Sequence, residues 1–485
     1  MTAVINVDTA AEGVPISPDI YGQYLEHVED CVEPGLITEQ GLSEDVIEAA
    51  RDLGVPAIRW PGGCFADVYH WRDGIGPDRP ARPNWHWGNG EVESNRFGTH
   101  EFLDWCEQVG ATPYINVNLG SGDLIEALRW LDYCSGSADT ADVLARRANG
   151  RTDPWRVGYW GIGNETWGSW EAGWMDAGRY ADVLDNWAGF FHKYDPDATI
   201  VGVGSSEGLD PDWDRTVLQR AGSQLGLLSL HVYAATVIGE ADQRRSGLVQ
   251  FPSYLEQRIT AMAGLVREHN RVNGHDVGIA LDEWNIRHWR RAADGYHLDR
   301  ADPRSGSDAL CAAGFFHSMI KNADVVRMAN YVFLVNGNGV LDARGGGCRP
   351  TTLAAIFQAY RRNLHGAALP VTVDGGPVVP TARLASGHPD GVADGRASAQ
   401  QTALSAMPST LPALDVVASR AENVIRLALI NRSDQPVDVH WSDVARLHLD
   451  QFVVDTRREV LDRHRSESSG AFILPAWSTT IAVEA

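Results

Sequence analysis

The sequence predicts an α/β protein, a (β/α)8 TIM barrel followed by an all-β sandwich domain. Between residues 19 and 336, eight short apolar runs alternate with segments of helical character. Eight such units are more typical of a closed parallel barrel than of an open sheet. After about residue 360 the apolar runs are strand-like, and Gly, Asp and Ser turns separate them. A chain of 485 residues is long enough for one large and one smaller domain.

The barrel units each begin with a strand and continue with a helix. The strands are predicted at residues 19–26, 55–60, 112–118, 157–165, 199–205, 227–233, 277–283 and 326–336. The helices are predicted at residues 43–50, 99–109, 123–133, 176–193, 212–221, 253–270 and 308–322. The first helix illustrates the reasoning, because Ser43 is a candidate N-cap, acidic residues fill the first turn, and Gly54 follows the end.

The residues on either side of the barrel are predicted to form the sandwich. We place the barrel at residues 19–360 and the β-sandwich domain at residues 1–18 together with 361–485. A lone strand at residues 3–7 is expected to complete the sandwich. The other strands are expected near residues 369–373, 377–380, 411–417, 424–430, 437–441 and 471–474, and a surface loop at residues 384–408.

Charge and composition exclude several classes of partner. The net charge of −23 argues against nucleic acid or an anionic membrane as the partner. The N-terminus does not resemble a signal peptide, and no apolar run approaches the roughly 18 residues of a membrane span. The six cysteines show neither CxxC nor zinc spacing. We therefore expect a cytoplasmic protein with free thiols and no metal site.

Two strand-like runs end in a glutamate beside tryptophan. Tyr159–Trp170 contains Asn164-Glu165 followed by tryptophans, and the run 277–284 ends in Glu283-Trp284. Carboxylate, amide and aromatic side chains close together are typical of a carbohydrate-binding site. A pair of carboxyl groups is what glycoside hydrolysis needs, one as proton donor and the other as nucleophile or base.

Polar residues gather at the predicted carboxyl ends of the strands, where barrels carry their chemistry. Tyr233 is expected to donate a hydrogen bond to Glu283, and Arg59 to keep Glu283 ionised. Repulsion between the two glutamates is expected to keep one of them protonated. Strand alternation predicts that Asp282 points away from the pocket. His231 is interpreted as a hydrogen-bonded barrel histidine, and Trp167 and Trp170 are placed in the sugar site.

Several motifs resemble glycoside hydrolase family 51, the α-L-arabinofuranosidases. They are Arg59–Pro77, Phe97–Phe102, Tyr159–Glu165 and Asp282–Asn285. The resemblance implies a barrel plus β-sandwich, no cofactor and a retaining, exo-acting mechanism on a furanoside-containing oligosaccharide. By matching position, Glu165 is the acid/base and Glu283 the nucleophile. Glu26, Arg59, Asn164 and Tyr233 line the furanose subsite, and Trp87 matches in the loop after the second strand.

Three departures from the family pattern leave the sugar open. Cys64 stands where many members carry Asn, Phe333 stands where a Gln is usual, and the residues after Glu165 differ. Cys64 and Phe333 therefore join the predicted substrate-binding residues. The alternatives are a furanosidase for galactofuranose or D-arabinofuranose, a glucan-cleaving relative, and a non-catalytic sugar-binding barrel. We also expect a homo-oligomer.

Overall fold

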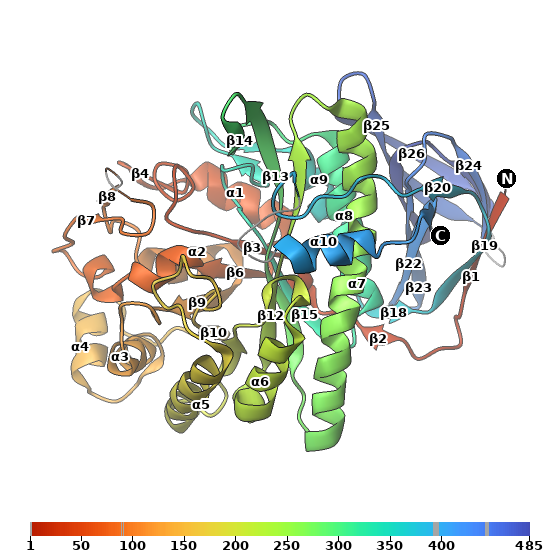
Figure 1. Cartoon of the computed structure of the whole chain (residues 1–485). Helices are drawn as coiled ribbons and strands as arrows, with labels where there is room; N and C mark the ends of the chain where they lie inside the picture. Colours follow the sequence, from red (N-terminus) through yellow and green to blue (C-terminus); the bar gives the residue numbers. More distant parts are fainter. Residues whose placement is uncertain (1, 89, 91, 391–396, 442–445) are drawn as a thin grey trace.

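A closed barrel of eight parallel strands forms the centre of the protein in this computed structural model, which describes residues 2–88, 90, 92–390, 397–441 and 446–485 (Figure 1). The strands follow one another around the barrel, and pairing between β12 and β13 closes it. They are β3 (Gly22–Tyr24), β6 (Ala57–Trp60), β9 (Thr112–Val117), β10 (Tyr159–Ile162), β11 (Thr199–Gly202), β12 (Leu227–Val237), β13 (Gly278–Ala292) and β15 (Val326–Tyr331). The predicted barrel is therefore confirmed.

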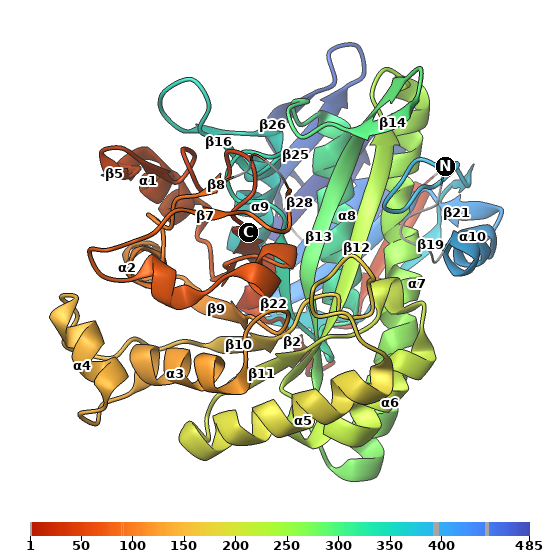
Figure 2. The ribbon, with the colours of Figure 1, turned by 60° about the vertical axis from the view of Figure 1, so that its left-hand side comes forward.

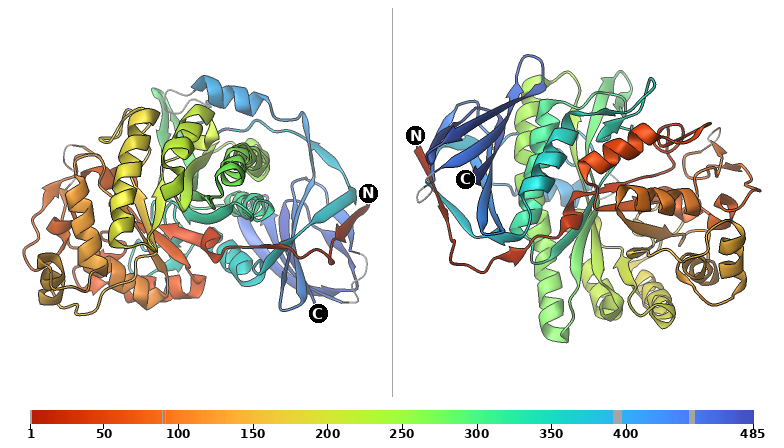
Figure 3. Two further views of the ribbon diagram at one scale, coloured as in Figure 1. Left: turned by 90° about the horizontal axis from the view of Figure 1, so that it is seen from below. Right: turned by 180° about the vertical axis from the view of Figure 1, so that it is seen from behind.

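Helices surround the strands, as the view along the barrel shows (Figure 3). They are α1 (Glu44–Leu53), α2 (Thr99–Val109), α3 (Leu124–Ser135), α4 (Ala141–Ala148), α5 (Ala177–Tyr194), α6 (Pro211–Ala221), α7 (Ala241–Asn273), α8 (Gly306–Lys321) and α9 (Thr352–Asn363). Helix α7 passes through Pro252, whose ring lies against Gly314 of α8; a Cβ at Gly314 would lie 2.3 Å from Pro252 Cγ. The glycine thus lets the two helices approach closely.

Two sheets form the β-rich part of the protein, on one side of the barrel (Figure 1). The first contains β19 (Val371–Gly375), β1 (Thr2–Val7), β24 (Val437–Trp441) and β27 (Ala471–Leu474). The second contains β2 (Val14–Pro15), β18 (Ala367–Leu369), β22 (Leu414–Ala421), β23 (Val424–Asn431), β28 (Ser478–Glu484), β25 (Leu447–Asp455) and β26 (Val460–Ser468). A shared core joins the sheets, with Ile5 and Leu429 among its buried side chains. The predicted sandwich is confirmed, and β1 pairs within it; the domain limits at residues 18 and 360 stay a prediction.

Several element predictions were wrong in detail. Residues 19–26 begin as a 3-10 turn, Pro18–Tyr21, because Pro18 starts the turn and the Ser17 hydroxyl accepts from the Asp19 amide at 3.3 Å. The predicted loop at 384–408 contains α10 (Ala397–Ser405), while residues 391–396 of that loop lie outside the described residues. The sequence analysis did not predict helices α4 and α9 or strands β25, β26 and β28. None of the described helices combines the length and apolarity needed to cross a bilayer.

The largest difference from prediction concerns strands β12 and β13. Both continue well past the barrel rim, and β13 folds back into a hairpin with β14 (Gly295–Leu298) (Figure 2). The pairing runs on to Val237 and Trp289, so Glu283 lies within a long strand and not at its end. The two strands form a wall above the barrel mouth.

Candidate active site

Glu165 and Glu283 lie at the same end of the barrel, brought together from two non-adjacent strands. Glu165 follows β10 in a loop and has a positive φ of 41°, which is uncommon for a residue other than glycine. Glu283 is part of β13 and is 7% exposed. An oxygen of Glu165, an oxygen of Glu283 and a ring nitrogen of His231 lie within 4.8 Å of one another. The two predicted catalytic carboxyl groups therefore share one small space.

Two buried donors hold Glu283 in place. Arg59 Nη1 donates to Glu283 Oε1 at 2.8 Å, and the Tyr233 hydroxyl donates to Glu283 Oε2 at 2.5 Å. Arg59 also donates through Nη2 to Asn164 Oδ1 at 2.8 Å. Both expected contacts of Glu283 are thus present, and charge-assisted bonds of this kind are the strong ones. They fix the direction of the Glu283 carboxyl group.

His231 lies between the two glutamates, and each of its ring nitrogens faces a carboxylate. Its Nδ1 contacts Glu165 Oε1 at 2.7 Å and Glu283 Oε2 at 3.5 Å, while its Nε2 contacts Asp282 Oδ1 at 3.2 Å. Burial opposes the charge, yet the carboxylates of Glu283, Asp282 and Glu165 raise the pKa of His231 to about 10. The imidazolium is therefore the stable form at neutral pH.

The imidazolium changes the expected relation between the two glutamates. Burial raises the pKa of Glu165, but the hydrogen bond and charge of His231 outweigh it, and the net shift is downward. Mutual repulsion alone was expected to keep one carboxyl protonated. The pKa shifts instead favour a protonated His231 beside an ionised Glu165.

Asp282 does not point away from the site, as strand alternation had predicted. Its side chain is 2% exposed and lies inside the barrel, where the Tyr114 hydroxyl donates to it at 2.9 Å and Arg59 Nε lies 3.8 Å away. The pairing of β13 with β15 shifts register between Leu281 and Trp284. Such an irregularity lets consecutive residues face the same side of a strand. Asp282 thus supports Arg59 and His231 from below.

Glu26 forms another wall of the pocket, against a close turn of backbone. Its Oε1 accepts from the amides of Gly63 and Phe65, each at 3.1 Å. A Cβ at Gly62 would lie 2.4 Å from Glu26 Cγ, and one at Gly63 would lie 2.3 Å from Glu283 Oε1. The two glycines after β6 therefore let the chain pass between the carboxyl groups. Burial, reinforced by the charge of Glu283, raises the pKa of Glu26 to about 7.

The pocket gathers the predicted residues, with two of them beneath its floor. Its lining includes Glu26, Cys64, Trp87, Glu165, Tyr233, Glu283 and Phe333. Arg59 and Asn164, each 1% exposed, act from below through the bonds described. Phe333 follows β15 and packs with its ring 5.7 Å from that of Tyr24. Of the two expected tryptophans, Trp170 donates to Glu165 Oε2 at 3.3 Å, whereas Trp167 donates to the Gly204 carbonyl at 3.1 Å and packs on Trp170.

Arg287 and Arg300 also line this pocket, and the sequence analysis did not single them out. The Arg287 guanidinium lies 3.9 Å from the centre of the Tyr233 ring. Residues 283, 285 and 287 share one face of β13 by the period of two in a strand. Continuing the alternation past Glu283 would have identified Arg287. Arg300, which comes from the β14 side, had no such signal.

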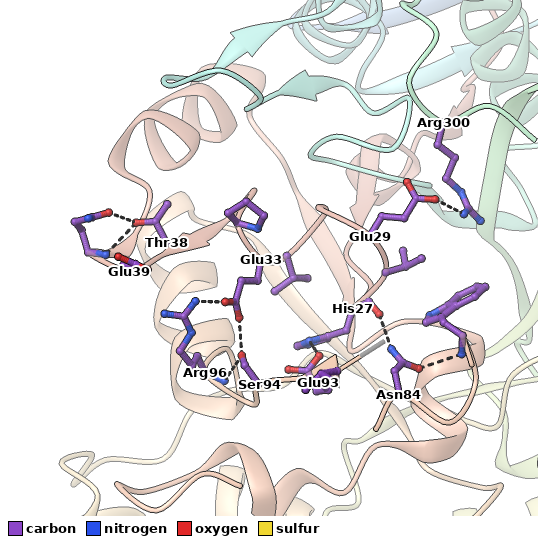
Figure 4. Close-up of a pocket in the computed structure, with 16 residues that line it drawn as sticks. His27, Glu29, Glu33, Thr38, Glu39, Asn84, Glu93, Ser94, Arg96 and Arg300 are labelled. Atoms are coloured by element: carbon purple, nitrogen blue, oxygen red, sulfur yellow. Dashed lines mark hydrogen bonds and ion pairs between the residues drawn. The ribbon is translucent and has the colours of Figure 1, made fainter. Parts of the chain in front are cut away.

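A second and larger cavity, of about 700 Å³, adjoins the pocket and shares Trp87 and Arg300 with it (Figure 4). Most of its charged side chains are paired with one another. Arg300 donates to Glu29 at 2.8 Å, and His27 Nδ1 contacts Glu93 at 2.7 Å. In Figure 4, Glu33 bonds Arg96 and Ser94 on the opposite side. The paired glutamates of the barrel face the smaller pocket and not this one.

Known proteins match the chain in sequence and in structure. Residues 49–243 match the α-L-arabinofuranosidase 1 domain, and residues 282–457 match the α-L-arabinofuranosidase C-terminal domain. An intracellular exo-α-L-arabinofuranosidase of Bacteroides ovatus is 34% identical over 358 residues, which are 69% of this chain and 67% of that protein. A probable α-L-arabinofuranosidase C of Aspergillus niger is 33% identical over 387 residues, 74% of each chain.

A solved structure agrees over nearly the whole length. The GH51 α-L-arabinofuranosidase of Thermotoga petrophila superimposes with a TM-score of 0.83 at 29% identity and covers 99% of both chains. The barrel, the sandwich and the four motifs resembling family 51 therefore lead to the same family as the sequence matches. The chain therefore belongs to glycoside hydrolase family 51, the α-L-arabinofuranosidase family.

Proposed function

We propose that this protein is a retaining, exo-acting α-L-arabinofuranosidase that removes terminal non-reducing arabinofuranosyl residues from oligo- or polysaccharides. The main support for this proposal is the close approach of Glu165 and Glu283, since a carboxyl oxygen of one lies within 4.8 Å of a carboxyl oxygen of the other. Retaining glycosidases keep their carboxyl groups about 5–5.5 Å apart, whereas inverting enzymes leave room for a water. The relatives named for arabinofuranosidase activity support the substrate class.

The first step joins the sugar to Glu283. The Glu283 carboxylate, held by Arg59 and Tyr233, attacks the anomeric carbon, and Glu165 protonates the leaving oxygen. The proton reaches Glu165 from His231 Nδ1, its neighbour at 2.7 Å. Because the charge of Glu283 raises the pKa of His231, formation of the ester removes that charge and weakens the hold of His231 on the proton. Nucleophilic attack and proton release are thereby coupled.

The second step reverses the first with water in place of the aglycone. Glu165, now a carboxylate, removes a proton from the water that attacks the anomeric carbon. Glu283 leaves as a carboxylate, and its restored charge favours return of the proton from Glu165 to His231. Two displacements at one carbon give net retention.

Phe333 supports a second candidate, a furanosidase for another sugar. Its ring lines the pocket where the family resemblance implies a Gln, so a sugar hydroxyl on that side lacks an amide partner. Galactofuranose and D-arabinofuranose are the candidate sugars.

A panel of 4-nitrophenyl furanosides and pyranosides tests the proposed function, together with NMR of the first-formed anomer. Fastest turnover of the α-L-arabinofuranoside with retained configuration is expected; inversion, or no turnover of any furanoside, would refute the proposal.

We further propose a cytoplasmic location and a homo-oligomeric state. The location is supported by the name of the B. ovatus relative, which is called intracellular. The oligomeric state stays a prediction, and light scattering coupled to size-exclusion chromatography measures it directly. A mass equal to the 53.0 kDa chain would contradict it.

A further inference from the structure

Three side chains with metal-binding atoms meet beside the furanose pocket. Cys64 starts the 3-10 turn Cys64–Val68 after β6, His86 lies in the loop between β7 (Arg82–Pro83) and β8 (Val92–Glu93), and Glu171 lies in the loop after β10. One atom from each, a thiol sulfur, a ring nitrogen and a carboxylate oxygen, lies within 4.8 Å of the other two. Because Glu165, His231 and Glu283 serve the reaction, this second group is not explained by it.

Glu171 lacks the partners that a buried carboxyl group needs. It is 4% exposed, and its Oε1 accepts one long hydrogen bond from Asn164 Nδ2 at 3.3 Å. Its Oε2 is buried without a hydrogen-bond partner among the described residues. Buried polar atoms are paired in most proteins, so an orphaned carboxylate oxygen points to a ligand. Burial, with the nearby charges of Glu165 and Asp67, raises the pKa of Glu171 to about 9.

The other two side chains have free ligand atoms as well. His86 packs edge-on against Trp87, with ring centres 4.6 Å apart, and neither ring nitrogen bonds a residue in the described ranges. Cys64 is a free thiol, whose sulfur lies 3.9 Å from Asn164 Nδ2 and which also forms a side-chain hydrogen bond with Glu171. Three side chains of different chemistry therefore converge, and they make few hydrogen bonds.

We propose that Cys64, His86 and Glu171 form a binding site for a thiophilic divalent cation, with Zn²⁺ as the best fit. Thiolate, imidazole and carboxylate are the ligands that zinc takes in proteins, whereas Ca²⁺ and Mg²⁺ require oxygen ligands. Three protein ligands leave a fourth tetrahedral position for water or a sugar hydroxyl. Binding releases the protons of Cys64 and Glu171, so affinity rises with pH.

Occupation of the site affects the reaction, because Cys64 also lines the pocket that holds Glu165 and Glu283. A cation there takes space from the furanose and places positive charge near Glu165. We therefore expect Zn²⁺ to inhibit, in competition with the furanoside. The site makes the enzyme responsive to thiophilic metals without giving the metal any part in glycoside cleavage.

The test is a titration of the purified full-length protein with Co²⁺, a spectroscopic substitute for Zn²⁺. We expect one equivalent to produce a thiolate-to-cobalt charge-transfer band in the near ultraviolet, which Zn²⁺ then abolishes. The Cys64→Ser variant is expected to lack the band, whereas Cys348→Ser, at another half-buried free thiol, is expected to retain it. His86→Gln and Glu171→Gln are each expected to weaken Co²⁺ binding at least about tenfold.

Three outcomes would overturn the proposed metal site. The absence of a band in the wild-type protein, a band that persists in Cys64→Ser, or affinity that is unchanged in His86→Gln or Glu171→Gln would each do so. Circular dichroism and Tm verify that every variant is folded before its titration is interpreted. Because binding is read from absorption, the result does not depend on which furanoside the enzyme cleaves.

Discussion

Removal of the Tyr233 hydroxyl tests how the nucleophile is positioned. In Tyr233→Phe, Glu283 Oε2 loses its 2.5 Å donor while Oε1 keeps Arg59 at 2.8 Å. The aromatic ring remains, so the stacking of Arg287 at 3.9 Å from the ring centre is preserved. The substitution therefore isolates one hydrogen bond at little cost to packing.

The size of the effect follows from the charge and burial of Glu283. A hydrogen bond to a charged group contributes about 1.5–3 kcal/mol, and each 1.36 kcal/mol corresponds to a factor of ten in rate. Because Arg59 and His231 still hold the carboxylate, we expect the lower half of this range. The predicted fall in kcat/KM is about 10- to 40-fold.

The assay compares kcat/KM for 4-nitrophenyl α-L-arabinofuranoside between wild type and variant, with Tm measured alongside. Tyr296→Phe is the matched control, because the hydroxyl of Tyr296 on β14 bonds Arg291 away from the paired glutamates. The control is expected to leave kcat/KM unchanged. A Tyr233→Phe enzyme with wild-type kcat/KM would refute the role of this bond in orienting Glu283.

Four further substitutions test the remaining roles. Glu283→Ala is expected to abolish turnover, with azide restoring product of inverted configuration because the smaller side chain admits an external anion; wild-type turnover would remove Glu283 from its role. Glu165→Gln is expected to slow substrates with poor leaving groups far more than activated aryl furanosides, since only the former need protonation; equal losses would argue against proton transfer by Glu165. Phe333→Gln is expected to raise the turnover of α-L-arabinofuranoside relative to galactofuranoside, because the new amide offers a hydrogen bond of about 1 kcal/mol, and an unchanged ratio contradicts this. Folding raises the pKa of Glu171 from 4.5 to about 9, so the folded state loses stability relative to the unfolded chain as pH increases through this range. With EDTA present, the Tm of Glu171→Gln is therefore expected to fall less than that of the wild type between about pH 5 and about pH 8. Equal falls in Tm would contradict the raised pKa.

The catalytic pair was predictable from the sequence because its signal is local. Asn164-Glu165 and Asp282-Glu283 each follow a buried apolar run, and parallel barrel strands bring their carboxyl ends to one face. The same reasoning correctly identified Tyr233 as a donor to Glu283. The prediction for Asp282 was wrong because β13 departs from regular pairing. The register shift after Leu281 turns Asp282 into the barrel, and no local sequence pattern predicts such a shift.

The fold class and the pair of glutamates could be predicted from the sequence, because strand periodicity, turn residues and motif spacing are local properties of the chain. The electrostatics of the site depend on how distant segments pack together. The pKa of His231 depends on three carboxylates, two from β13 and one from the loop after β10. Glu171 Oε2, which has no hydrogen-bond partner among the described residues, lies in a cluster built from loops far apart in sequence. Burial and through-space charge set those properties, and both exist only after the barrel has closed.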